Sequence, residues 1–281
     1  MFKRYRAFFK TGMMNMLAYK FAVFTWLFVC ILSLSCTFFL WTAVYNNSPV
    51  DVINGFTFKG IIAYTIFVNI FGFALGSSET QDVITDEIQN GQIAMSLIKP
   101  ISYRLRFTFS ALGTLTASNI ITGIPLMTAA TIIFCLNGFM EFPGFKTFLI
   151  TLLFFFVAQI LAKLLSDSID YIFGLISFYT MASFGLFQMK EVIVNFLSGM
   201  LIPIAFFPEW AAKIINYLPF VGVAQNPVLI YLGKMGFKEA AFSLLMQVVW
   251  IVILEIFAHF FYNAAIKKIT IQGGWHVKTI F

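Results

Sequence analysis

Five ionisable side chains stand inside long apolar stretches of the sequence, where charged groups are rare. Lys163, Asp167 and Asp170 follow one another at i, i+4 and i+7, and Glu255 and His259 repeat the i, i+4 spacing. On a helix, each set lies along one face. Paired carboxylates are a common arrangement for general acid–base catalysis, and a carboxylate with an imidazole can relay protons. A lysine beside carboxylates also forms ion pairs, which satisfy the charges without any substrate.

The elements that carry these groups belong to a membrane protein. The chain has 281 residues, 60% of them hydrophobic and 11% charged, with 18 Lys and Arg against 12 Asp and Glu and a net charge of +6. A soluble domain carries about 25% charged residues, so this chain lacks the charge to cover a water-facing surface. Six helices of about 20 to 25 residues would occupy about half of it. We therefore expect any catalytic or energy-supplying module to be another polypeptide.

We predict a single all-α transmembrane domain over residues 1–281, with six membrane-spanning helices. Uncharged runs long enough to cross the bilayer define the first three, and interrupted apolar runs define the others. The predicted spans are 21–45, 60–78, 107–137, 147–178, 185–207 and 240–266. A reading with separate short spans at 147–162 and 171–189 gives seven crossings instead.

The basic residues predict which side of the membrane holds the termini. Twelve of the 18 Lys and Arg fall in the N-terminal segment, the loop after the second span, the turn after the fourth and the tail. The positive-inside rule then places both termini in the cytoplasm, for a protein of the plasma membrane. Seven crossings would place the tail lysines outside, against that rule. Basic and apolar residues mixed over 1–20 predict an amphipathic interfacial helix on the inner leaflet or, alternatively, a simple basic flank.

The loop 79–106 is the most polar part of the chain. Its apolar residues recur at intervals of roughly three to five, namely Val83, Ile84, Ile88, Ile93 and Leu97. The pattern predicts a short amphipathic cytoplasmic helix, broken near Gly91 and stopped by Pro100. Such a helix is either a passive interfacial element or a docking surface, and the composition leaves both open.

Within this loop, the run DEIQNGQIAMSLIKPISY at 86–103 combines an acidic residue, an Ile, a Gly and a Leu-x-Lys-Pro ending. It resembles the cytoplasmic loop of permease subunits in the ABC-2-type ABC transporter family. The resemblance continues, in the family's order, in FLSGMLIPIAFFPEW at 196–210, LPF at 218–220, NPVLIYLG at 226–233 and QGG at 272–274. These motifs are spread from about residue 79 to residue 274.

The resemblance implies a coupling helix that seats in a groove of a cytoplasmic ATPase. The contacts that it implies are Asp86, Glu87, Ile88, Gly91, Ile93, Leu97 and Pro100. No GxxxxGK[ST] pattern occurs in the sequence, so the expected site for ATP and Mg²⁺ is on separate ABC ATPase subunits, and this chain is expected to bind no cofactor or metal. The other expected partners are a second, identical or related permease subunit and membrane lipid, but not nucleic acid.

Two further groups of residues are candidate transport elements. Lys163, Asp167, Asp170, Glu255 and His259 form a predicted intramembrane polar seam, in which Lys163 and Glu255 fall at similar depth and their two faces are expected to meet or to line one cavity. Alone, His259 is expected to be a hydrogen-bonding core residue. An outer re-entrant segment is predicted as the outer gate, although ordinary extracellular packing is an alternative; its residues are Ser198, Gly199, Pro203, Pro208, Glu209 and Trp210.

These features predict the permease subunit of an ATP-driven ABC transporter that is not itself an enzyme. It would export an amphiphilic, peptide or drug-like substrate by alternating access. One alternative is a proton-coupled secondary transporter that uses Asp170, Glu255 and His259. Another is an intramembrane enzyme that uses Asp167 and Asp170 as a carboxylate pair.

Overall fold

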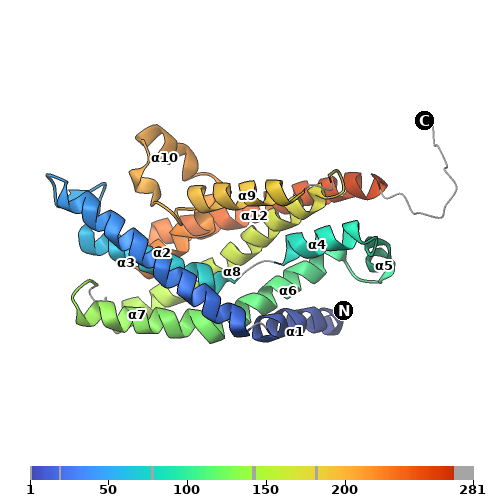
Figure 1. Cartoon of the computed structure of the whole chain (residues 1–281), viewed down its shortest axis with the longest axis horizontal. Coiled ribbons are helices and arrows are strands. Elements are labelled where there is room, and N and C mark those ends of the chain that lie inside the picture. Colours follow the sequence, from blue (N-terminus) through green and yellow to red (C-terminus); the bar gives the residue numbers. More distant parts are fainter. Residues whose placement is uncertain (1, 19, 77–78, 141–143, 181–182, 269–281) are drawn as a thin grey trace.

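The computed structural model describes residues 2–18, 20–76, 79–140, 144–180 and 183–268, and helices dominate it (Figure 1). In chain order the α-helices are α1 (Phe2–Ala18), α2 (Lys20–Asn46), α3 (Phe58–Leu75), α4 (Thr80–Gln89), α5 (Ile93–Ile98), α6 (Tyr103–Ser118), α7 (Ile124–Leu136), α8 (Phe145–Ile176), α9 (Ser183–Leu197), α10 (Glu209–Ile215), α11 (Gln225–Tyr231) and α12 (Phe237–Ala265). A π-helical turn, η1 (Asn119–Gly123), joins α6 to α7. Short 3₁₀ turns complete the set, namely η2 (Ile204–Phe206), η3 (Pro219–Gly222) and η4 (Ile266–Lys268).

A two-stranded hairpin between α2 and α3 is the exception to the predicted all-α architecture. Strands β1 (Val52–Ile53) and β2 (Phe56–Thr57) pair antiparallel. Asn54 and Gly55 form the turn with φ of 48° and 82°. Asn-Gly with positive φ at both positions is the strongest short-range hairpin signal in a sequence. The hairpin was therefore predictable from this dipeptide, although the sequence analysis assigned no strand here.

Four stretches of the described chain are long and apolar enough to cross a membrane. They are Phe58–Leu75, Tyr103–Leu136, Phe145–Ile176 and Phe237–Ala265. They coincide, within a few residues, with the second, third, fourth and sixth predicted spans. Helix α2 covers the first predicted span, and its shorter apolar part is Ile31–Asn46. The chain is a multi-pass, mainly α-helical membrane protein.

The predicted span 185–207 differs most from the structure. Helix α9 ends at Leu197 after 15 residues, which is about 22 Å of helix against a hydrocarbon core of about 30 Å. Gly199 turns the chain out of the helix with φ of 82°. The Ser198 carbonyl accepts a hydrogen bond from the Gln225 backbone N–H at 3.0 Å instead of from a following helical turn.

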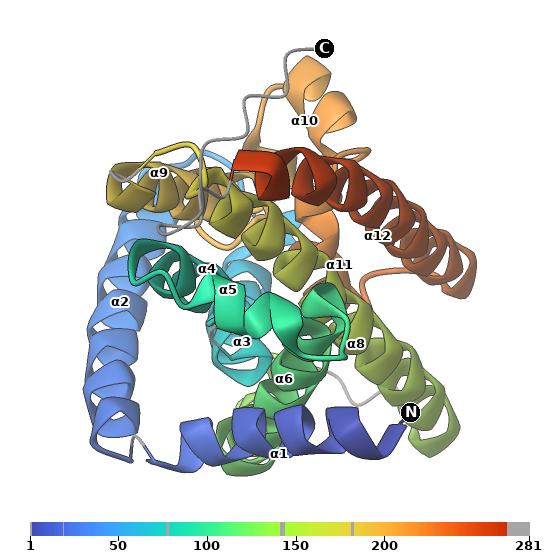
Figure 2. The same ribbon diagram turned by 90° about the vertical axis from the view of Figure 1, so that its right-hand side faces the viewer.

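The core forms around α3. Its aromatic residues Phe67 and Phe71 are fully buried and pack against Tyr231 of α11 and Phe155 of α8, with ring centroids 5.2 and 5.9 Å apart. In α3, 61% of an 18-residue apolar stretch is buried inside the protein, whereas the corresponding share in α12 is 17%. Figure 2 accordingly shows α3 at the centre and α2 and α12 at the periphery.

The two ends of the molecule hold different elements. Figure 1 shows the start of α1, the α4–α5 pair and the end of α12 at one end, and β1–β2 with the end of α7 at the other. Helix α1 packs along α6: the Tyr5 ring stacks on Phe109 with centroids 5.1 Å apart, and the Tyr5 hydroxyl accepts a hydrogen bond from the Ser102 N–H. The predicted N-terminal helix is therefore present, and protein contacts hold one of its faces.

Candidate functional site

The α4–α5 hairpin, formed by residues 80–98, is braced from inside by one carboxylate. Glu87 accepts hydrogen bonds from Ser96 Oγ at 2.9 Å, Tyr103 Oη at 3.0 Å and Arg106 Nη2 at 2.6 Å. The Arg106 guanidinium also lies over the Tyr103 ring, 4.6 Å from its centroid. We refer to Glu87, Ser96, Tyr103 and Arg106 as the Glu87 cluster. It ties together the end of α4, helix α5 and the start of α6.

The Glu87 cluster keeps its carboxylate charged. Partial burial acts against the charge, but the hydrogen bonds and charge of Arg106, with the bonds from Ser96 and Tyr103, outweigh it, and the pKa of Glu87 is lowered from its usual value. The pair with Arg106 is therefore ionised at neutral pH. Each partner is nearly buried, with 9% of the Arg106 side chain and 13% of the Glu87 side chain exposed.

The predicted break in the loop helix is confirmed. Helix α4 ends at Gln89, Gly91 has φ of 70°, and α5 starts at Ile93. A Cβ on Gly91 would meet nothing within 4 Å, so the glycine is needed for its backbone conformation and not for space. Helix α5 ends at Ile98, just before Lys99 and Pro100, as the proline predicts.

The seven residues carried over from the family resemblance do not share one surface. Asp86, Gly91 and Pro100 are exposed, whereas Glu87 and Ile88 are half-buried. Ile93 is only 4% exposed and packs inside. Leu97 lies in α5, and its side chain is outside the described part of the structure.

Two apolar residues of α5 that the sequence analysis did not single out are strongly exposed. Met95 is 70% exposed and Ile98 is 79% exposed, and they lie three residues apart on α5. On a helix this spacing places them on one face. The available signal was that both stand off the apolar stripe through Ile93 and Leu97. Sequence alone did not show which stripe faces inward.

A second ionic cluster lies between the long helices, centred on Arg104 of α6. Its guanidinium donates to Asp167 Oδ2 at 2.6 Å and to Glu255 through Nε at 2.9 Å and Nη2 at 2.5 Å. It also donates to Ser168 Oγ at 3.1 Å and lies 4.7 Å from the centroid of the Tyr171 ring. Two carboxylates from α8 and α12 therefore share one arginine.

Further contacts extend this arrangement, which we call the Arg104 cluster. Thr80 Oγ1 at the start of α4 donates to Asp167 Oδ1 at 2.5 Å. Ser168 Oγ donates to Glu255 Oε1 at 2.8 Å. Helices α4, α6, α8 and α12 are thus joined at one point. The Asp167 side chain is 0% exposed there, against 37% for Glu255.

The predicted seam residues are therefore divided among different partners. Lys163 is buried and donates to the Gly76 carbonyl at 3.0 Å. Asp170 pairs with Lys190 of α9 at 2.5 Å. A direct hydrogen bond between α8 and α12 joins Ser168 to Glu255, five residues after Lys163. Sequence reasoning missed Arg104 as a seam residue because it counted this residue only as basic flank. The available signal was that the predicted seam holds three acidic residues but only one lysine, so a further basic residue was needed to pair with them.

The expectation for His259 is confirmed for its hydrogen bond but is wrong for its place in the core. This residue is exposed, not in the core, and its ring nitrogen is 3.1 Å from the Asn263 side-chain amide. The buried positions of α12 run through Gln247, Ala258 and Ala265. His259 lies one position beside this stripe, so it faces away from the packed side of the helix.

The first part of the predicted outer gate, residues 198–204, is a packed turn. The Gly199 carbonyl accepts from Tyr64 Oη at 2.7 Å, and Gln225 Oε1 accepts from the Ile204 N–H at 2.8 Å. A Cβ on Gly199 would come within 3 Å of Tyr64 and Gln225. Ser198 is fully buried. This turn therefore fixes the end of α9 against α3 and α11.

The part of the predicted gate that follows residue 207 is exposed. Pro203 is buried before η2, but Pro208 and Glu209 are exposed at the start of α10 and Trp210 is 70% exposed. Figure 1 shows α10 projecting from the bundle. The six residues predicted to act together thus occupy two environments.

Within the described part of the chain, no group of three or more His, Cys, Asp or Glu side chains could hold a metal.

Comparison with known proteins identifies the family. No curated protein matches the sequence. A family model described as "ABC-2 family transporter protein" matches residues 31–273, a range that includes the α4–α5 hairpin, the Arg104 cluster and the segment 198–210. The chain therefore belongs to the ABC-2 family of transporter proteins and is a membrane component of a transport system.

Proposed function

We propose that the chain is the permease subunit of an ATP-driven exporter. It crosses the plasma membrane six times, with both termini in the cytoplasm and with α9 and the residues up to 207 as the fifth crossing. It pairs with a second, identical or related permease and with cytoplasmic ABC ATPase subunits, which bind ATP and Mg²⁺. Its substrate is an amphiphilic, peptide or drug-like molecule, moved by alternating access.

The observation that carries this proposal is an exposed apolar tip on a braced hairpin. Met95 and Ile98 are 70% and 79% exposed at the end of the molecule that holds α5, the start of α1 and the end of α12 (Figure 1). Adjacent large apolar side chains exposed outside the spanning helices suit a contact with a protein or with the membrane surface, and the proposal assigns this pair to a protein contact. Exposed Asp82 and Asp86 add negative charge to α4, the other helix of the hairpin, which suits a partner groove with basic residues.

A route from this tip to the spanning helices supports coupling. The Glu87 cluster holds α4, α5 and α6 together, and Thr80 links α4 to Asp167 of the Arg104 cluster. In the proposal, ATP binding closes the ATPases and moves the hairpin as a rigid piece. The movement reaches α8 and α12 through Arg104, and the packed turn at Gly199 opens or closes the outer side.

The partners of the ionisable groups favour this function over the alternatives. Asp170 is bound to Lys190, Glu255 to Arg104, and His259 is exposed beside Asn263. A proton relay needs groups within hydrogen-bonding reach of one another, and these three have separate partners. Likewise, Asp167 and Asp170 bind different basic residues, which does not suit a shared catalytic proton.

The test is to remove the exposed tip. The double variant Met95→Ala/Ile98→Ala is compared with Leu136→Ala, an 81% exposed leucine at the end of α7. Truncation of two contact residues should weaken co-purification of the ATPase about tenfold or more, and ATP-dependent transport should fall with it. The Leu136→Ala control should retain both. Substrate transport by the purified chain alone, driven by a proton gradient without ATP, would overturn the proposal.

A further inference from the structure

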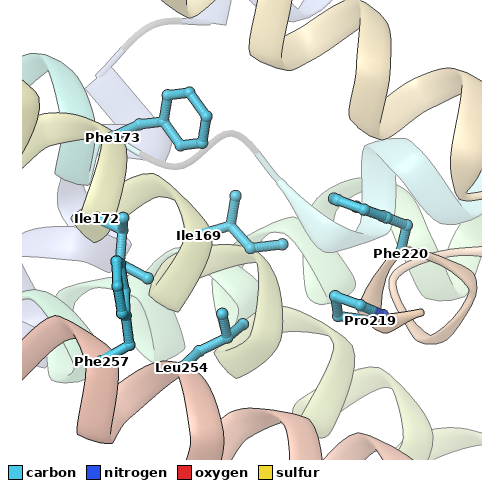
Figure 3. Close-up of a pocket in the computed structure, with 7 residues that line it drawn as sticks. All are labelled: Ile169, Ile172, Phe173, Pro219, Phe220, Leu254 and Phe257. Carbon is cyan, nitrogen blue, oxygen red and sulfur yellow. The ribbon is translucent and has the colours of Figure 1, made fainter. Parts of the chain in front are cut away.

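An apolar crevice lies between α8, α12 and the η3 turn (Figure 3). Its seven lining side chains are all apolar: Ile169, Ile172, Phe173, Pro219, Phe220, Leu254 and Phe257. The cavity volume is about 190 Å³. Drug-sized ligands occupy pockets of about 300 to 1,000 Å³, whereas an apolar cavity of about 150 Å³ holds one benzene molecule. The crevice therefore suits one apolar chain or ring and not a whole amphiphile.

The floor and the rim of the crevice differ in exposure. Ile169 and Ile172 on the floor are 7% and 9% exposed, whereas Phe257 at the rim is 54% exposed. On α12 the rim continues into Ile256 and Phe260, which are 53% and 69% exposed. Both α8 and α12 are long and apolar enough to cross a membrane. The mouth of the crevice thus continues into a surface suited to hydrocarbon and not to water.

We propose that this crevice binds one acyl chain of a bilayer phospholipid. An empty apolar space loses the contacts that its lining atoms would otherwise make, and a lipid chain from the adjoining bilayer is the apolar material in greatest supply there. The inserted chain packs on Ile169 and Ile172, while its headgroup stays in the surrounding leaflet.

The position of the crevice gives the bound chain a structural consequence. Ile169 and Leu254 are sequence neighbours of Ser168 and Glu255, which join α8 to α12 at 2.8 Å. A chain in the crevice therefore fills the space beside this junction and supports the separation of the two helices. This inference rests on the membrane-spanning character of α8 and α12 and is independent of ATP coupling.

The experiment uses the full chain in nanodiscs of phosphatidylcholine that carries a diazirine near the end of one acyl chain. After illumination, adducts are assigned to residues by mass spectrometry. Lipid on the outer surface labels exposed residues such as Phe260. Adducts on Ile169 or Ile172 are expected only from a chain inside the crevice, because both side chains are nearly buried. Labelling confined to the exposed residues overturns the proposal.

Three variants sharpen the result. Ile169→Trp fills the crevice and should lower labelling of Ile172 about tenfold while Phe260 labelling stays constant. Ile256→Trp, the matched change on the exposed face of α12, should leave Ile172 labelling unchanged. Phe220→Ala widens the crevice and should raise it, so the inference stays testable if the buried tryptophan disturbs folding. Equal labelling of Ile172 in the filled and widened variants contradicts the proposal, as does its loss on addition of a transported substrate, which would assign the crevice to that substrate.

Discussion

Two arginines, two positions apart on α6, organise two ionic clusters of different character. Arg106 turns toward the α4–α5 hairpin and binds Glu87, which lies 19 positions earlier in the chain. Arg104 turns toward α8 and α12 and binds Asp167 and Glu255, which lie 63 and 151 positions later. Residues two positions apart on a helix point to nearly opposite sides. One turn of α6 therefore makes both a local and a long-range contact.

The two clusters also differ in how readily water could hydrate a charged group whose partner has been removed. Asp167 is fully buried, whereas the Glu87 side chain retains 13% exposure at the edge of a projecting hairpin. A buried charge left without its partner is strongly destabilising, whereas a group near the surface can be rehydrated. The Arg104 cluster is therefore expected to hold the long helices together, and the Glu87 cluster to set the shape of the hairpin.

The largest expected effect is that of Arg104→Met. The change keeps most of the side-chain volume but leaves Asp167 buried without its arginine, and losses of about 3 to 5 kcal/mol are typical for this kind of change. Unfolding of the purified protein by denaturant in detergent micelles would measure the loss.

The double variant Arg104→Met/Asp167→Asn is the control for this prediction. It removes the buried charge together with its partner, and most of the lost stability should return. If the single variant unfolds at the same denaturant concentration as the wild type, the Arg104 cluster does not hold the helices together, and the contrast between the two clusters fails.

The same contrast explains what could be predicted from the sequence. The α4–α5 hairpin was predictable in outline because its signals are local: Gly91 breaks the helix and Pro100 stops it. Its brace is local too, since Glu87 and Arg106 are only 19 positions apart. The apolar runs likewise revealed four long helices within a few residues. Such features depend on composition and on neighbours in the chain.

Features that depend on tertiary packing were not predictable in this way. Arg104 was counted as basic flank because nothing near it in the chain indicates Asp167 or Glu255. The end of α9 at Leu197 depends on the hydrogen bond from Gln225 to Ser198, 27 positions away. His259 was placed in the core because the i, i+4 pattern with Glu255 does not show that the buried stripe of α12 runs through Ala258.

A smaller effect on stability is expected for Glu87→Gln. The amide keeps the shape but loses the charge that binds Arg106, and about 1.5 to 3 kcal/mol is expected for a hydrogen bond to a charged group. The pKa of Glu87 is lowered in the folded protein, so its contribution to stability is present above the usual pKa of about 4.3 and is lost as the pH falls through the folded-state pKa. The stability difference between wild type and variant should be constant from about pH 8 to pH 5.5 and shrink at about pH 4 and below.

The neighbouring Asp86→Asn is the matched control, because Asp86 is exposed on the same helix. It should leave the unfolding free energy within about 0.5 kcal/mol of the wild-type value. If the proposed ATPase partner binds this hairpin, Glu87→Gln should also reduce its stimulation, since the hairpin loses its internal brace. A variant that loses stability equally at pH 7 and pH 3.5 would show that Glu87 acts through packing and not through its charge.

The smallest effect is expected at His259, which lies outside both clusters. Its ring is exposed and its partner, Asn263, is one turn further along the same helix. His259→Gln should change stability by no more than about 0.5 kcal/mol. Because the residue has no contact with Arg104 or Asp170 in the described structure, the variant should also transport substrate with an unchanged pH profile between about pH 5 and pH 8. Transport assays in vesicles at fixed ATP would measure this profile. If His259→Gln flattened the profile, the imidazole would take part in transport. That result would favour the proton-coupled alternative over a mechanism based on the Glu87 and Arg104 clusters.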